Sequence, residues 1–325
     1  MENRPLTPKT LKKDIRSVCL TVAAFVATIS IASALFVVVV ILVDMISSGV
    51  INTAAAQGQS VIAEYMSGPR YNARVNELIG PTSCVSIIVG SLWFFLIRGK
   101  RLVTSDITKR NQTPTASMLL QLLIVMFGIQ FFMVLINILT QPLLNLIDVS
   151  ATDSINEATD SLFATPFGIL YVVIIGPVFE EIVFRGAVMR KLEPYGANFA
   201  IVTSAILFGL YHIILFQAVF AFILGLVLAY TAGRYSLKWA IVLHILNNLL
   251  AFMTYLYPEA GIVVLMLYFV GFIVTIVLLA VRRGVLTSQR RVGAPVFPRV
   301  SRIAYSTPLF IIFVVVFVLL GVLIL

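Results

Sequence analysis

Long runs of apolar residues, separated by short polar segments, dominate the pattern along the chain. A helix needs about 20 apolar residues to cross about 30 Å of hydrocarbon, and nine runs approach or exceed that length. The pattern therefore predicts an all-α, polytopic transmembrane helical bundle with about nine spans, with eight or ten as the alternatives. The runs lie at residues 18–44, 82–97, 116–145, 167–189, 198–214, 216–232, 237–257, 260–281 and 306–325.

The basic residues between these runs predict the orientation of the bundle. Of the 23 Lys and Arg residues, all but Arg70 and Arg74 belong to the N-terminal tail or to the side of the bundle that it shares. The acidic segment 146–163 carries four Asp or Glu residues and no basic one. Because cytoplasmic loops are enriched in Lys and Arg, we expect a cytoplasmic N-terminus and an integral protein of a bacterial plasma membrane.

Composition narrows the classes of partner. Sixty per cent hydrophobic and 11% charged residues exclude an ordinary soluble domain. The net charge of +9 favours contact with anionic lipid, and we expect no nucleic-acid partner because the basic residues form no recognisable module. Three regions are expected: a three-span region at 1–163, a four-span core at 164–257 that holds the intramembrane ionisable residues of interest, and a two-span region at 258–325.

Two adjacent glutamates lie in the run at 167–189. Ionisable groups inside a membrane are costly, so they are usually paired or functional. Glu181 and Arg185 are four residues apart and share a helix face, which predicts an ion pair, whereas Glu180 points about 100° away. Pro177 removes a backbone hydrogen bond just before the pair and predicts a kink with room for water. A structural ion pair beside a spare, protonated glutamate is the alternative interpretation.

The only two histidines of the chain lie in later runs of the same core. His212 follows Phe208 by four residues, and His244 precedes Asn248 by four, so each pair shares a helix face. Taken singly, a histidine or asparagine in such a helix is more often a hydrogen-bonded core residue than a catalytic one. Together with the glutamates, these residues predict one polar site.

Such groups can hydrolyse a peptide bond with an activated water. A buried glutamate such as Glu180 can act as general base, and His212 can orient the same water. His244 and Asn248 can donate hydrogen bonds to the tetrahedral oxyanion. The chain has no serine nucleophile elbow, no HExxH motif and no cysteine near the histidines. We expect no cofactor, although zinc is possible, with Glu180, His212 and His244 as its ligands.

Three motifs, in this order on successive membrane helices, resemble those of a known family. Residues 180–185 match EExxxR, residues 208–212 match FxxxH, and residues 244–248 match HxxxN. The set is similar to that of the CPBP family, which groups type II CAAX prenyl endopeptidases with bacteriocin-processing and Abi immunity proteins. The resemblance covers about 165–255.

The resemblance implies an intramembrane endopeptidase. We expect its substrates to be membrane-associated peptides or lipidated proteins, cut at a cavity open to the cytoplasmic side. A glutamate-dependent mechanism is favoured over a metalloprotease. Carried over to this chain, the resemblance implies that Glu180 is the base and that His212 positions the water. His244 and Asn248 would stabilise the oxyanion.

Glu181 and Arg185 would have supporting roles in that scheme. Two functions of other classes use the same polar groups. One is a proton-coupled transporter, in which the groups relay protons. The other is a non-catalytic immunity or scaffold protein that acts by binding.

Overall fold

The computed structural model describes residues 7–150, 152–281 and 296–323, and in this part of the chain nearly every residue is helical and no strand is present. The predicted all-α membrane bundle is confirmed. The long helices are α1 (Pro8–Ser47), α4 (Pro69–Arg98), α5 (Ala116–Leu144), α10 (Ala197–Tyr211), α11 (Leu215–Arg234), α12 (Leu237–Leu256), α13 (Gly261–Val281) and α16 (Pro308–Leu323). The shorter ones are α2 (Val50–Gln57), α3 (Ser60–Ser67), η1 (Leu102–Asp106), η2 (Asn145–Ile147), α6 (Asp153–Phe163), η6 (Pro258–Ala260) and α15 (Val296–Tyr305).

Residues 166–195 form one composite helix in which α-helical and π-helical segments alternate, and a 3-10 turn ends it. It has the length and apolarity of a membrane span. Because it carries both glutamates, its irregular backbone decides where their side chains point. Its segments are α7 (Pro166–Leu170), η3 (Tyr171–Ile175), α8 (Gly176–Glu181), η4 (Ile182–Met189), α9 (Arg190–Leu192) and η5 (Glu193–Tyr195).

The number of candidate spans in the described residues reaches the predicted alternative of eight but not nine. Within the described ranges, seven helices are long and apolar enough to cross a membrane, or eight if α15 and α16, which meet at a bend of 72°, count as one span. The predicted span at 198–214 corresponds to α10, whose 15 residues reach only about 22 Å. The nine apolar runs are therefore helical, but a count of nine crossings is not confirmed. The end of the last run (324–325) and the basic residues at 4 and 282–291 lie outside the described residues.

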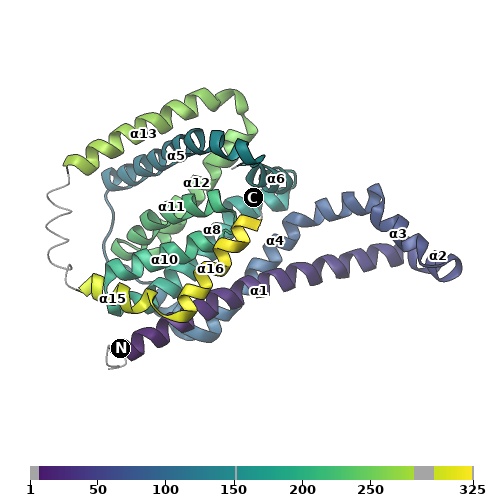
Figure 1. Ribbon diagram of the computed structural model, residues 1–325, viewed down its shortest axis with the longest axis horizontal. Helices are drawn as coiled ribbons and strands as arrows, with labels where there is room; N and C mark the ends of the chain where they lie inside the picture. The colour runs from purple at the N-terminus through teal and green to yellow at the C-terminus, as the bar shows by residue number, and fades with distance from the viewer. Residues whose placement is uncertain (1–6, 151, 282–295, 324–325) are drawn as a thin grey trace.

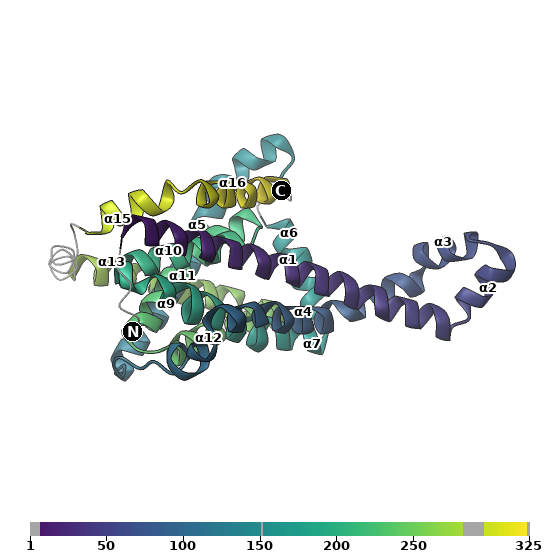
Figure 2. The same ribbon diagram turned by 90° about the horizontal axis from the view of Figure 1, so that it is seen from below.

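Helices α1 and α4 form a long hairpin that projects from the bundle (Figure 1), and Figure 2 shows α2 and α3 at its far end. The hydroxyls of Ser33 and Ser86 hydrogen-bond across it at 2.7 Å. Near the tip, Arg70 donates to both carboxylate oxygens of Asp44 at 3.0 and 3.1 Å, and Tyr65 donates to the same carboxylate at 2.8 Å. Arg70, one of the two exceptions to the charge pattern, thus neutralises an aspartate at the end of a span.

Helices α5 and α13 pack side by side along one edge of the bundle (Figure 1). Gly128 and Gly271 permit this approach, because a Cβ at Gly271 would lie 2.7 Å from the Cβ of Phe127 and one at Gly128 would lie 3.0 Å from the Gly271 carbonyl oxygen. Small residues at such contacts are typical of membrane helices. Helix α5 also contacts α11, so it reaches the core region.

The connection between α10 and α11 is a tight turn. Ile213 has φ of +59°, and the N–H of Ile214 donates to the His212 carbonyl oxygen at 2.6 Å. A positive φ at a β-branched residue is a strained conformation that costs about 1–3 kcal/mol. Helix α16 covers the turn so closely that a Cβ at Gly321 would lie 2.5 Å from the Ile213 carbonyl oxygen. Because α10 is short, a start at the membrane surface places this turn inside the hydrocarbon region.

Candidate active site

The two glutamates lie on α8, between two π-helical segments. The N–H of Gly176 donates to the carbonyl oxygen of Tyr171, five residues back, and the next residue, Pro177, has no N–H. The distortion predicted before the glutamates therefore takes the form of a π-helical turn. Such turns occur frequently at functional sites.

Glu181 lies in the protein interior. Its side chain is fully buried, and its Oε1 accepts from Arg185 Nη1 at 2.7 Å and lies 3.0 Å from His244 Nδ1. The predicted ion pair is present. Arg185 is also fully buried, donates to the Gly225 carbonyl oxygen at 3.3 Å, and lies 4.1 Å above the ring of Phe208, a favourable cation–π contact.

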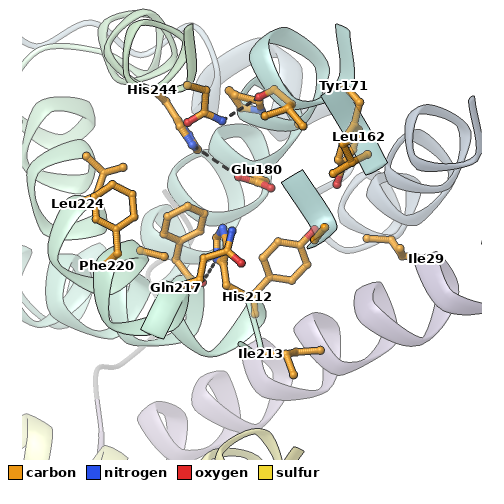
Figure 3. Close-up of a pocket in the computed structure, with 18 of the residues that line it drawn as sticks. Ile29, Leu162, Tyr171, Glu180, His212, Ile213, Gln217, Phe220, Leu224 and His244 are labelled. Atoms are coloured by element: carbon orange, nitrogen blue, oxygen red, sulfur yellow. Dashed lines mark hydrogen bonds and ion pairs between the residues drawn. The ribbon is translucent and has the colours of Figure 1, made fainter. Parts of the chain in front are cut away.

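Glu180 lies on the open side, beside a cavity of about 370 Å³. Figure 3 shows its carboxylate between His244 on one side and His212 on the other. All four residues expected to be catalytic line this single cavity: Glu180, His212, His244 and Asn248. Residues distant in sequence, from α8, the end of α10 and α12, therefore come together as the motifs predicted.

The hydrogen bonds of the two imidazoles fix which nitrogen faces outward. His212 Nδ1 lies 2.9 Å from the carbonyl oxygen of Phe208, which can only accept, so Nδ1 carries the proton and Nε2 is left as an acceptor. His244 Nδ1 faces the carboxylate of Glu181, so it also donates. His244 Nε2 lies 3.8 Å from Glu180 Oε2, a distance too long for a direct hydrogen bond and compatible with a bridging water.

Asn248 has a more constrained position than its motif indicates. Its Nδ2 donates to the carbonyl oxygen of Val172 at 2.8 Å, and its Oδ1 accepts from Asn247 Nδ2 at 3.1 Å. A carboxamide carries two N–H groups, so one remains for a ligand in the cavity. The expected role as an oxyanion donor therefore depends on this second N–H.

Several polar residues of the site were missed by sequence reasoning. Tyr171, Tyr211, Ser30 and Gln217 also line the cavity. Gln217 could have been found from the sequence, because a glutamine inside an apolar run is costly in a membrane and therefore indicates a polar site. The tyrosines gave no such signal, since their apolar rings merge with the hydrophobic pattern.

The residues named as possible metal ligands do not form a ready ligand set. Among the described residues, no three His, Cys, Asp or Glu side chains cluster closely enough to hold a metal ion. His212 and His244 line the same cavity as Glu180, but the arrangement lacks the convergence of three ligands that a zinc site requires. The expectation of no cofactor, with zinc as the alternative, stays a prediction.

The cavity has lining residues on the side of the acidic segment. Ala158 and Leu162 belong to α6, and they border the cavity together with Val26 and Ile29 of α1. The charge pattern assigns α6 to the side opposite the basic loops. The expected opening toward the cytoplasm therefore stays a prediction, and this lining favours the opposite face.

The fold and the site define a multispan helical membrane protein with an intramembrane glutamate, histidine and asparagine cluster. Residues 162–250 match the family model described as "Type II CAAX prenyl endopeptidase Rce1-like". This match confirms the family resemblance predicted from the three motifs and indicates protease activity in general terms. No curated protein and no solved structure matches the chain significantly.

Proposed function

We propose that this protein is an intramembrane endopeptidase that hydrolyses a peptide bond next to a lipidated cysteine. One observation carries the proposal: Glu180, His212, His244 and Asn248 line the same cavity, within the stretch that matches a CAAX prenyl endopeptidase model. The apolar walls contributed by α1 and α11 suit a lipid chain or an apolar peptide.

In the proposed reaction, Glu180 removes a proton from a water molecule while Nε2 of His212 accepts a hydrogen bond from the same water. The water oxygen forms a bond to the scissile carbonyl carbon, and the carbonyl oxygen becomes an oxyanion. The free N–H of Asn248 donates to this oxyanion, as does Nε2 of His244 when that ring carries both protons. The C–N bond then breaks, and Glu180 returns its proton to the leaving amine.

In this scheme Glu181 and Arg185 do not contact the substrate, but position His244. The carboxylate of Glu181 accepts a hydrogen bond from the Nδ1–H of His244 and so fixes the orientation of the imidazole, while Arg185 donates to the same carboxylate. A carboxylate that fixes the tautomer and orientation of a catalytic histidine in this way contributes strongly to activity.

The test is a cleavage assay with purified protein in detergent and a fluorogenic farnesylated peptide that ends in a CAAX sequence. We expect the wild type to release the C-terminal tripeptide and the Glu180→Gln and His212→Ala variants to lose at least about 100-fold in kcat. The control variant is Gln121→Met, whose glutamine donates to Ser117 on its own helix. Wild-type turnover in both site variants, or no release by the wild type, would overturn the proposal.

Two further outcomes separate this function from its rivals. Flux of a solute in proteoliposomes without any peptide product favours a transporter. Stoichiometric zinc in the purified protein, whose removal by a chelator abolishes cleavage, replaces the water-activation scheme with a metal-dependent one.

A further inference from the structure

Helix α5 lies outside the stretch that matches the family model, yet one of its side chains connects to the site. Gln130 Nε2 donates to Asn247 Oδ1 at 3.0 Å. Asn247 in turn donates to Asn248 at 3.1 Å, and Asn248 donates to the carbonyl oxygen of Val172 at 2.8 Å. Three carboxamides thus form one chain from α5 through α12 to the composite helix.

The backbone of the composite helix explains why this series of hydrogen bonds ends at the Val172 carbonyl oxygen. In the π-helical turn, the N–H of Gly176 bonds to Tyr171, and the next position in that register is Pro177, which has no N–H for Val172. A buried carbonyl without a partner costs free energy. The Asn248 carboxamide supplies the hydrogen bond that the proline cannot.

Chemistry then sets the direction of every hydrogen bond in the chain. The Val172 carbonyl can only accept, so Asn248 must turn its NH₂ toward it and its oxygen toward Asn247. Asn247 must therefore present its own NH₂ to Asn248 and its oxygen to Gln130. The Asn247 oxygen therefore needs a hydrogen-bond donor, and the Gln130 NH₂ group supplies it.

We propose that Gln130 is a positioning residue for the reaction, acting through Asn247 on the Asn248 carboxamide. This inference rests on the proposed function. By holding Asn247 in one of its two amide orientations, Gln130 keeps the second N–H of Asn248 in place for the oxyanion. Hydrogen bonds linked in series in a low-dielectric interior strengthen one another, so the effect passes along the chain. Helix α5 thereby contributes a positioning residue to the active site.

The alternative is that Gln130 only joins two helices, as interhelical amides in membranes commonly do. The two roles differ in what they change. A joining role affects the stability of the fold, and it does so whether or not Asn248 is present. A positioning role affects stabilisation of the transition state, so it lowers kcat with KM unchanged and disappears when Asn248 is removed.

The experiment measures kcat and KM with the farnesylated CAAX peptide, together with the melting temperature of each variant in detergent. Gln130→Met removes the donor and keeps the length of the side chain, and Gln121→Met is the matched change on the same helix. We expect Gln130→Met to lower kcat roughly threefold to tenfold, the range that one lost hydrogen bond gives, with KM unchanged. Gln121→Met is expected to keep wild-type kcat.

The same substitution is then repeated in the Asn248→Ala background, where we expect no further loss. Asn247→Leu, which breaks the chain at its next member, is expected to lower kcat at least as much as Gln130→Met. A wild-type kcat in Gln130→Met, or an equal fold-loss in the Asn248→Ala background, would overturn the inference. If the wild type cleaves no peptide, the proposed function fails instead, so the two failures are distinguishable.

Discussion

The buried ion pair between Glu181 and Arg185 gives a quantitative test of the site. In the Arg185→Met variant, Glu181 loses a charge-assisted hydrogen bond of 2.7 Å and keeps only His244 as a partner at Oε1. Both members of the pair are completely buried, so the carboxylate stays uncompensated in a low-dielectric interior. Breaking a buried pair in this way costs about 3–5 kcal/mol of unfolding free energy.

An exposed ion pair with a similar N–O distance serves as the control for burial. Lys109 and Glu193 are 2.9 Å apart, but the lysine side chain is 44% exposed. Lys109→Met is therefore expected to cost at most about 1 kcal/mol. The double variant Glu181→Gln with Arg185→Met removes both charges, and we expect it to be more stable than Arg185→Met alone.

The assay is reversible unfolding in mixed detergent micelles, with tryptophan fluorescence as the signal. The reasoning is refuted if Arg185→Met loses no more free energy than Lys109→Met. It is also refuted if the double variant is less stable than the single one, because the penalty would then not come from an unpaired charge.

Two further predictions concern the turn and the cavity. Ile213 has positive φ and Ile214 has φ of −56°, so Ile213→Gly should cost less stability than Ile214→Gly by about 1–3 kcal/mol; equal losses in thermal unfolding would show that the turn is not strained. Leu162 lines the cavity from α6, so we expect Leu162→Cys in intact cells to react with a membrane-impermeant thiol reagent. Leu139→Cys, on a 72% exposed apolar position of α5, should not react, because lipid covers it. Reaction of Leu162→Cys only after permeabilisation would assign the cavity to the cytoplasmic side.

Much of this arrangement could be predicted from sequence because the motifs are local. Glu181 and Arg185 pair as their four-residue spacing requires, and the FxxxH spacing brings His212 Nδ1 to the Phe208 carbonyl. The apolar runs likewise mark the helices. These features depend on helical periodicity alone, which the sequence carries directly.

The features that escaped prediction depend on tertiary contacts. The link from Gln130 to Asn247 joins residues 117 positions apart, and no periodicity relates them. The role of Asn248 toward Val172 follows from a π-helical register that Pro177 permits but does not dictate. The count of nine spans is not confirmed at α10, because this apolar run ends early, in a turn at Ile213 that packs against Gly321.

The shortness of α10 has a consequence for the lipid environment of the reaction. A helix of 15 residues is about five residues too short to carry His212 to the far surface of a bilayer. His212 is therefore expected inside the hydrocarbon region, and the cavity that it lines with Glu180 is expected to bring water to that depth. Under the proposed function, a substrate anchored by a lipid chain would present its peptide bond to this water without leaving the leaflet that holds it.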